Sequence, residues 1–282
     1  MASMKTFRLT LSLAAALGVA TSARAQETTT TQTETTTQTQ PSTTSTEMST
    51  TSTDMTMHSD GGRMGPEIAI SGNLGLGVGY VYKNAQTASG EESLKITDSA
   101  KFSIPVLVEL GYRVTPRFYI GAFGSWEKVF TKENPLSCPS GFDCNTQQWR
   151  VGPEFRYHFS PEAGFDPWIG LGVGLEILKS HVKGTTNIPV APGVTVPADV
   201  DTHVTDRGPT FARLAIGGDW HLSRAVALGP IATVSYGSYT VRTGDQKVTL
   251  PVIGTRDNAL TPVDNGPHAL FTVGLRLAFL PL

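Results

Sequence analysis

From Gly65 onward, apolar and polar residues alternate with a period of two along most of the chain. This period is typical of β-strands whose two faces meet different environments. The clearest stretch has Trp149 and Val151 on one face and Arg150 and Glu154 on the other. The pattern predicts eight strands, at about residues 68–82, 101–113, 118–126, 149–159, 169–177, 213–222, 226–236 and 268–279.

The connections between these strands alternate in length. The short ones fall at residues 115–117, 160–166 and 223–225, and the long ones fall at residues 83–99, 129–146, 179–207 and 242–266. With an even number of antiparallel strands, the short turns and both barrel ends lie at one end, and the long loops lie at the other. The sequence therefore predicts an all-β fold, an eight-stranded antiparallel β-barrel.

The alternation alone does not say which face is buried, because a soluble lipocalin-like barrel would turn its apolar row inward. Three features favour an exterior in contact with lipid. The polar row is rich in glycine, which suits a crowded interior, and the strands run for about ten to fourteen residues, enough to cross a bilayer at a tilt. Aromatic residues also bracket the apolar rows, as interfacial girdles do. The predicted girdle comprises Tyr80, Tyr82, Tyr112, Phe118, Trp126, Trp149, Tyr157, Phe159, Trp220, Tyr236 and Phe279.

The opposite face of the strands carries charges of both signs, which a transmembrane barrel would place in its lumen. A barrel of about eight strands is only wide enough to be filled by side chains, so these groups should form a paired network and leave no open channel. The expected lumen network comprises Lys101, Glu109, Arg113, Glu127, Arg150, Glu154, Arg156, Glu176, Arg213, Asp219 and Arg276.

The stretch Phe271-Thr-Val-Gly-Leu-Arg-Leu-Ala-Phe279 resembles the terminal strand of small bacterial outer-membrane barrels of the OmpA/OmpX type. The resemblance covers the chain from about Gly65 to its end, although Leu280-Pro281-Leu282 follow the aromatic residue on which such proteins usually end. It implies a bacterial outer-membrane location, with the long loops extracellular and the N-terminal linker and C-terminus periplasmic. It also implies outer-membrane lipid, lipopolysaccharide and the outer-membrane assembly machinery as partners.

The N-terminal part of the chain has a different character. Lys5 and Arg8 precede an apolar run, and the small-residue site Ala23-Arg24-Ala25 follows it, which is the pattern of an export signal. The next stretch is almost wholly Thr, Ser, Gln and Glu and cannot bury enough apolar surface to order itself. We expect a signal peptide at 1–25, a disordered Thr/Ser/Gln-rich linker at 26–64 and an outer-membrane β-barrel at 65–282.

Cys138 and Cys144 are the only cysteines and lie close together in Cys-Pro-Ser-Gly-Phe-Asp-Cys. In an exported protein this spacing predicts a disulfide within one loop. A zinc site would need neighbouring histidines, and a redox pair usually has the tighter C-x-x-C spacing.

Little in the sequence indicates catalysis or a cofactor. The Gly-x-Gly runs at 75–79 and 170–174 have strand periodicity and lack the strand-to-helix turn of a nucleotide site. A lipid-modifying enzyme needs a His, a Ser and an acid near the outer rim, but His181 and His203 have no recognisable arrangement and are read as solvated loop residues. We therefore expect no enzymatic activity and no cofactor.

A bound metal is not expected either. Thioether-rich segments can hold Cu(I), but the irregular spacing of the methionines favours exposed side chains in a polar tail. This segment contains Met48, Met55, Met57, His58 and Met64.

The net charge of −2 and the pI of 6.3 give no electrostatic footprint for nucleic acid. The expected function is a structural or surface-interaction role, with an unidentified extracellular ligand bound through the long loops. The first alternative is a small pore for ions or small solutes, and the second is an outer-membrane lipid-modifying enzyme.

Overall fold

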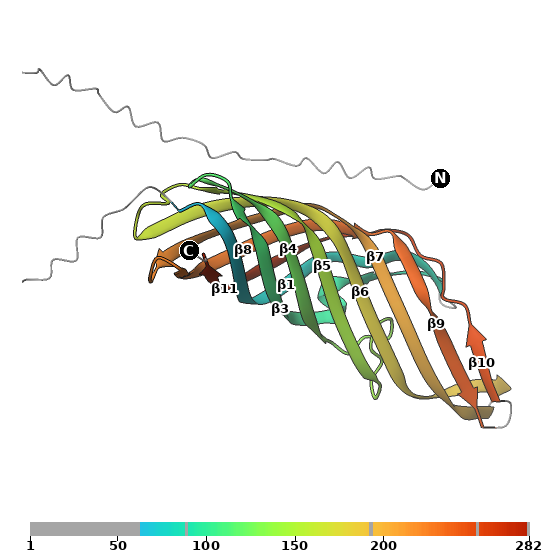
Figure 1. Ribbon diagram of the computed structural model, residues 1–282. Helices are drawn as coiled ribbons and strands as arrows, with labels where there is room; N and C mark the ends of the chain where they lie inside the picture. The colour runs from blue at the N-terminus through green and yellow to red at the C-terminus, as the bar shows by residue number, and fades with distance from the viewer. Residues whose placement is uncertain (1–62, 88–89, 192–193, 252–253, 281–282) are drawn as a thin grey trace, which may run out of the picture. The chain divides into compact units, whose positions relative to one another are not determined.

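The computed structural model describes residues 63–87, 90–191, 194–251 and 254–280, and this part consists almost wholly of antiparallel strands (Figure 1). The expected signal peptide and the linker up to residue 62 lie outside the described residues and stay predictions. Within the described ranges, no helix is both long and apolar enough to cross a membrane. The elements are β1 (Gly65–Thr87), β2 (Gly90–Lys95), α1 (Ile96–Ser99), β3 (Ala100–Arg113), β4 (Phe118–Thr131), β5 (Asp143–His158), β6 (Phe165–Ala191), β7 (Val194–His221), β8 (Val226–Tyr239), β9 (Val241–Leu250), β10 (Gly254–Asn258) and β11 (Gly266–Phe279).

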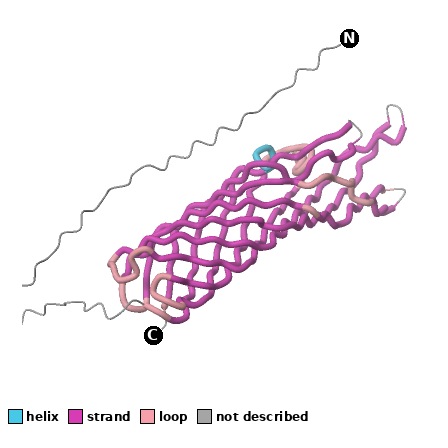
Figure 2. Tube along the Cα trace, turned by 90° about the horizontal axis from the view of Figure 1, so that it is seen from above, coloured by secondary structure: helices cyan, strands magenta, loops and turns pink. Residues whose placement is uncertain are grey.

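Eight of these strands close a ring, as the sequence predicts. Neighbours pair in the order β1, β3, β4, β5, β6, β7, β8 and β11, and β1 then pairs with β11 from Ile68↔Phe279 to Gly79↔His268. Figure 2 shows the strands running obliquely around the barrel. Closure satisfies the backbone hydrogen bonds that an open sheet would leave unpaired in lipid.

The expected long loops contain further strands. The segment between Lys179 and Arg207 continues β6 and β7 as a paired hairpin. The segment after Arg242 contains β9 and β10, and the segment after Lys83 contains β2 and α1. These segments are polar enough to be taken for loops, yet they are rich in Thr and Val, which favour strands and pair well across them.

The exterior of the barrel is apolar and its interior is charged. The outward side chains of Leu74 and Leu275 are 60% and 64% exposed, whereas Arg156 and Arg276 are 0% exposed. A soluble barrel would have the reverse arrangement, with its apolar row inside. The exterior is therefore a surface for contact with lipid, and the fold is that of a transmembrane barrel.

The structure places most of the predicted aromatic girdle on this outer surface. Tyr82 is the exception, because it is buried on the inner side of the wall. The register of β1 against β2 shifts between Tyr80 and Tyr82, and such an irregularity moves a side chain to the other face. The exposed members are Tyr112, Phe118, Trp126, Trp149, Phe159, Trp220, Tyr236 and Phe279, while Tyr80 and Tyr157 are half-buried.

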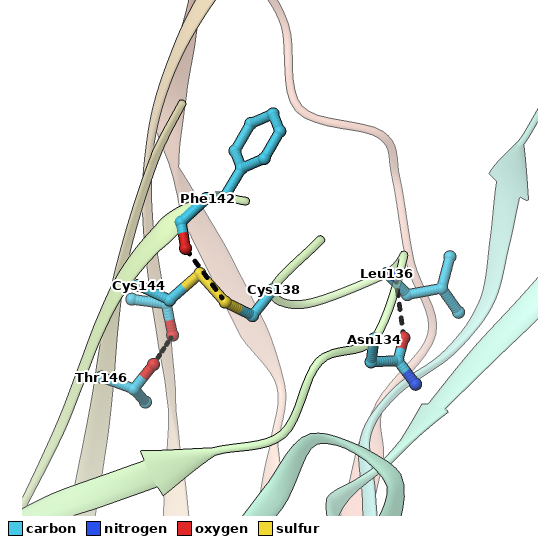
Figure 3. The surroundings of a disulfide bond; sticks show 7 residues. Asn134, Leu136, Cys138, Phe142, Cys144 and Thr146 are labelled. Atoms are coloured by element: carbon cyan, nitrogen blue, oxygen red, sulfur yellow. Dashed lines mark hydrogen bonds between the residues drawn. A yellow bond between two sulfur atoms is a disulfide. The ribbon is translucent and has the colours of Figure 1, made fainter. Parts of the chain in front are cut away.

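The expected disulfide between Cys138 and Cys144 is confirmed. Their Cα atoms are 5.9 Å apart, and the bond joins Cys138 in the loop between β4 and β5 to Cys144 at the start of β5 (Figure 3). The same loop is held by Asn134, whose Oδ1 accepts a hydrogen bond from the backbone N–H of Leu136 at 2.8 Å. Leu136 packs against a small apolar cluster that includes Tyr82, so the loop is anchored to the inner wall at the barrel mouth.

Candidate functional site

Buried charges fill the half of the lumen nearest the short turns. Arg276 on β11 contacts Glu109 at 2.6 Å, Asp219 at 2.9 Å and Glu67 at 2.5 Å. These carboxylates come from β3, β7 and β1, so a single guanidinium links four strands of the ring. Hydrogen bonds between charged groups are among the stronger ones in proteins.

Arg156 on β5 occupies a second position in the same layer. Its guanidinium contacts Glu67 at 2.7 Å and Glu109 at 2.9 Å. It also lies 4.4 Å from the ring centres of both Tyr119 and Trp168, a distance at which cation–π attraction is effective. The guanidinium of Arg156 is therefore neutralised by carboxylates at its edge and contacts aromatic rings on its faces.

The glycine-rich inner wall makes room for these rings. A side chain at Gly217 would collide with the ring of Trp168, and one at Gly121 would collide with Tyr119. Both aromatic side chains are fully or almost fully buried. Gly121 and Gly217 are thus explained by the close approach of aromatic rings to the backbone.

Further ion pairs complete this layer. Arg213 contacts Glu154 at 2.5 Å, and Arg113 lies 3.5 Å from Asp166. Asp166 also lies 2.8 Å from Nδ1 of His158. We call this connected set the lumen plug, and it consists of Glu67, Glu109, Arg113, Glu154, His158, Arg156, Asp166, Arg213, Asp219 and Arg276.

The structure buries all but one of the charged residues expected in the lumen. Lys101 is the one that differs, because it is exposed at the loop end of β3, where the lumen widens. The buried residues are Glu109, Arg113, Glu127, Arg150, Glu154, Arg156, Glu176, Arg213, Asp219 and Arg276.

The charged side chains of the lumen plug are buried inside the described part of the barrel. Arg113, Arg156 and Arg276 are 0% exposed, so a water-sized sphere does not touch them from either end. A ring of eight strands is narrow enough for side chains of such a layer to fill it. An ion crossing the barrel would have to break several buried ion pairs, which is costly in a low-dielectric interior.

A second group of polar contacts lies above the lumen plug, toward the long loops. Arg150 pairs with Glu127 at 2.5 Å. Glu176 lies 3.1 Å from Nε2 of His268, and the ring of His268 stacks on Tyr239 with centroids 4.3 Å apart. These residues form the upper boundary of the filled part of the lumen.

Above this boundary the barrel holds a cavity of about 640 Å³. Most side chains along its inner wall are apolar, with Arg242 as a charged group at its edge. Arg242 donates to Asp206 at 2.7 Å and lies 4.2 Å from the ring centre of Tyr82. The apolar lining includes Leu94, Ile96, Leu136, Phe142, Leu178 and Leu270.

The wall of this cavity is interrupted between β1 and β3. β1 pairs with β3 as far as Gly75 and with β2 only from Tyr80 onward, and α1 lies between the two ladders. Leu76 and Val78 of β1 face outward, at 61% and 44% exposure, yet they also border the cavity. At this point the backbone of β1 alone separates the cavity from the lipid-facing surface.

No family model matches the sequence, and no curated protein matches it either. Solved structures do match. A major outer membrane protein from Thermus thermophilus is 9% identical, with 76% of this chain and 99% of that chain covered and a TM-score of 0.44. OprG from Pseudomonas aeruginosa is 12% identical over 78% and 99% of the two chains, with a TM-score of 0.41. Neisserial surface protein A is 13% identical over 75% and 95%, with a TM-score of 0.37.

The closed ring, its apolar exterior and its charged interior are the features of proteins that cross a bacterial outer membrane. The chain has the fold of an outer-membrane β-barrel. In such barrels the short turns are periplasmic and the long loops are extracellular, so the lumen plug lies toward the periplasm and the cavity toward the outside.

Sequence reasoning did not single out some members of this site. Glu67, Asp166 and His158 belong to the lumen plug, and Trp168 packs on it. The alternation along β1 could have placed Glu67 in the lumen, because Glu67 shares the inward face with Ala69 and Ser71. Nothing in the local sequence shows that Asp166 and His158 meet across a turn.

Proposed function

We propose that this barrel binds a small, largely apolar molecule in the cavity at its extracellular end and does not form a through-channel. The observation that carries the proposal is the apolar-lined cavity of about 640 Å³ directly above the sealed lumen plug. Ligand sites in proteins are commonly clefts of about 300 to 1,000 Å³ with a mainly apolar lining and a few polar groups. This refines a surface-interaction role and argues against the pore alternative.

The polar groups at the cavity are placed to orient a ligand. Lys101 is an exposed cation on its wall, and Arg242 is held in position by Asp206. An apolar body with one anionic or hydrogen-bond-accepting group would match both the lining and these cations. The disulfide-closed loop borders the same cavity through Leu136 and Pro139.

Binding can be tested with the fluorescent apolar probe 1-N-phenylnaphthylamine. Ser180 lines the cavity, whereas its neighbour Lys179 is exposed on the other face of β6. Ser180→Trp should fill the cavity and weaken probe binding to the detergent-folded protein by about tenfold or more, a loss of about 1.4 kcal/mol. Lys179→Trp is the matched control and should bind as the parent does. Equal affinity in the two variants would place the probe elsewhere.

The interrupted wall favours a second candidate function, the lateral passage of the bound molecule into the bilayer. Leu76 and Val78 border both the cavity and the lipid-facing surface. Such a route needs no opening of the lumen plug. It would make the protein a conduit for apolar solutes between the outside and the membrane.

This second function can be tested by following transfer of the probe into liposomes that contain the barrel. Val78→Trp should obstruct the opening and slow transfer several-fold, while probe binding in detergent stays unchanged. Leu74→Trp on the same outward face is the control, because Leu74 pairs with Val273 of β11 and precedes Gly75, the last residue of β1 paired with β3. If Val78→Trp transfers the probe as fast as Leu74→Trp, the lateral route is excluded.

A further inference from the structure

The hairpin of β6 and β7 brings together two histidines that are distant in the sequence. His181 and His203 are directly opposite partners in the antiparallel ladder. Both lie on the outward side of the hairpin, beyond Lys179 and Arg207, where the exposed residues change from apolar to charged. The pair is therefore accessible to solvent and lies beyond the apolar exterior of the barrel, toward the tip of the hairpin.

The side chains of this pair converge on one carboxylate. Nε2 of His181 lies 2.8 Å from Oδ1 of Asp201, and Nε2 of His203 lies 3.2 Å from the same atom. The two imidazole rings are stacked, with centroids 4.0 Å apart and an interplanar angle of 13°. One potential ligand atom from each of the three residues lies within 4.8 Å of the other two.

We propose that His181, His203 and Asp201 form a binding site for a divalent transition-metal ion of the Zn²⁺ class. Two imidazole nitrogens and one carboxylate oxygen are the donor set that such ions prefer, whereas Ca²⁺ and Mg²⁺ prefer oxygen alone. Three protein ligands leave one position of a tetrahedral shell open for water or an external group. The site is separate from the cavity and does not depend on the proposed function.

The placement of the ligands on paired strands supports this site. Opposite residues of an antiparallel pair have their Cβ atoms about 5 Å apart, which lets two imidazoles reach one ion. Asp201 stands two residues before His203 and so shares its face of β7. Binding requires the three donors to lie about 2.0 to 2.2 Å from a common centre, so the two stacked imidazole rings would have to tilt until both Nε2 lone pairs point at the ion.

The charges around the site are mixed. Lys183 of β6 lies directly opposite Asp201 in the hairpin. Lys247 opposes Asp201 on β9, and Asp245 opposes His203 and supplies a further carboxylate nearby.

Other soft donors in the described part of the chain do not compete strongly. Cys138 and Cys144 are joined in a disulfide, so no thiolate is offered. The methionines near His58 prefer Cu(I) to Zn²⁺. A zinc titration therefore distinguishes the hairpin site from the methionine-rich segment.

The test is a calorimetric titration of zinc chloride into the tag-free chain folded in detergent. We expect one ion per chain, released by a chelator. His203→Ala and Asp201→Asn should each weaken binding by at least about tenfold. Asp199→Asn is the matched control, because Asp199 is also on β7 but hydrogen-bonds Thr185 instead.

The variants must first show the gel mobility of a folded barrel, so that lost binding is not lost folding. The double variant His181→Ala with His203→Ala should not bind zinc at all. With Co²⁺ in place of zinc, only the parent and Asp199→Asn should give the absorption spectrum of a low-symmetry site with nitrogen and oxygen ligands. Absence of zinc binding by the parent would overturn the proposal. Unchanged binding by the double variant would overturn it as well.

Discussion

At the scale of single residues, the charges of the lumen plug are tolerated because each of its arginines meets more than one acid. Arg276 contacts three carboxylates, and Arg156 contacts carboxylates at its edge and aromatic rings on its faces. A buried charge without a partner costs several kcal/mol, so these contacts are interdependent. Removal of one member leaves the others uncompensated.

Arg276→Ala should therefore destabilise the barrel strongly. Glu67, Glu109 and Asp219 would lose a common partner, and the expected loss in the free energy of unfolding is about 3 to 5 kcal/mol. Urea unfolding in lipid vesicles, followed by gel mobility, measures it. Arg224→Ala at an exposed short turn is the control and should change stability by less than about 0.5 kcal/mol. Equal stability of the two variants would mean that water already solvates the lumen plug.

At the scale of elements, the long connections are structured parts of the barrel mouth. β6 and β7 pair well beyond the apolar belt, and β9 extends the same sheet through its pairing with β7. The loop between β4 and β5 is closed by a disulfide and anchored by Leu136. The extracellular end is thus a continuation of the strands, which holds the cavity and the histidine pair in place.

Loss of the disulfide should loosen the extracellular end of the barrel and leave the rest of the barrel unchanged. With Cys138→Ser and Cys144→Ser combined, the loop between β4 and β5 should become cleavable by added protease while the barrel keeps its folded gel mobility. The closed ring spans a sequence separation of only 6 residues, so the entropic contribution is at most about 2 to 3 kcal/mol on the chain-entropy model. A barrel that fails to fold without the disulfide would contradict this local role.

At the scale of the whole molecule, the barrel is divided into a filled periplasmic half and a hollow extracellular half. The division follows the side chains, because long charged and aromatic residues gather at one end and shorter apolar residues line the other. A molecule that enters from outside meets a closed floor. This division is consistent with the proposed role, in which the barrel holds or diverts a ligand and does not conduct bulk solute.

Planar bilayers provide the corresponding measurement. The parent protein should give no stable, large single-channel conductance, because we expect the buried charges of the lumen plug to block an aqueous path. Arg276→Ala combined with Arg156→Ala should introduce brief, small openings if it still inserts. Steady conductance from the parent would overturn the sealed-lumen interpretation and favour the pore alternative.

The sequence by itself determined the strand order, the face of each strand that lies inward and the disulfide. These follow from the period of two and from residue types, which are local properties of the chain. Strand parity alone places Glu109 and Arg276 inside the barrel, where both are buried. It misplaces Tyr82, since a register shift beside this residue is set by the partner strand and not by the local pattern.

Only the tertiary structure decided which inward groups meet. Arg276 and Glu67 are 209 positions apart in the sequence and touch because β11 and β1 close the ring. His181 and His203 have the local pattern of separate loop residues, and only the hairpin sets them opposite each other. Ion pairs and ligand sets depend on the stagger of the closed barrel, which is a property of all the strands together, and no local pattern of residues encodes it.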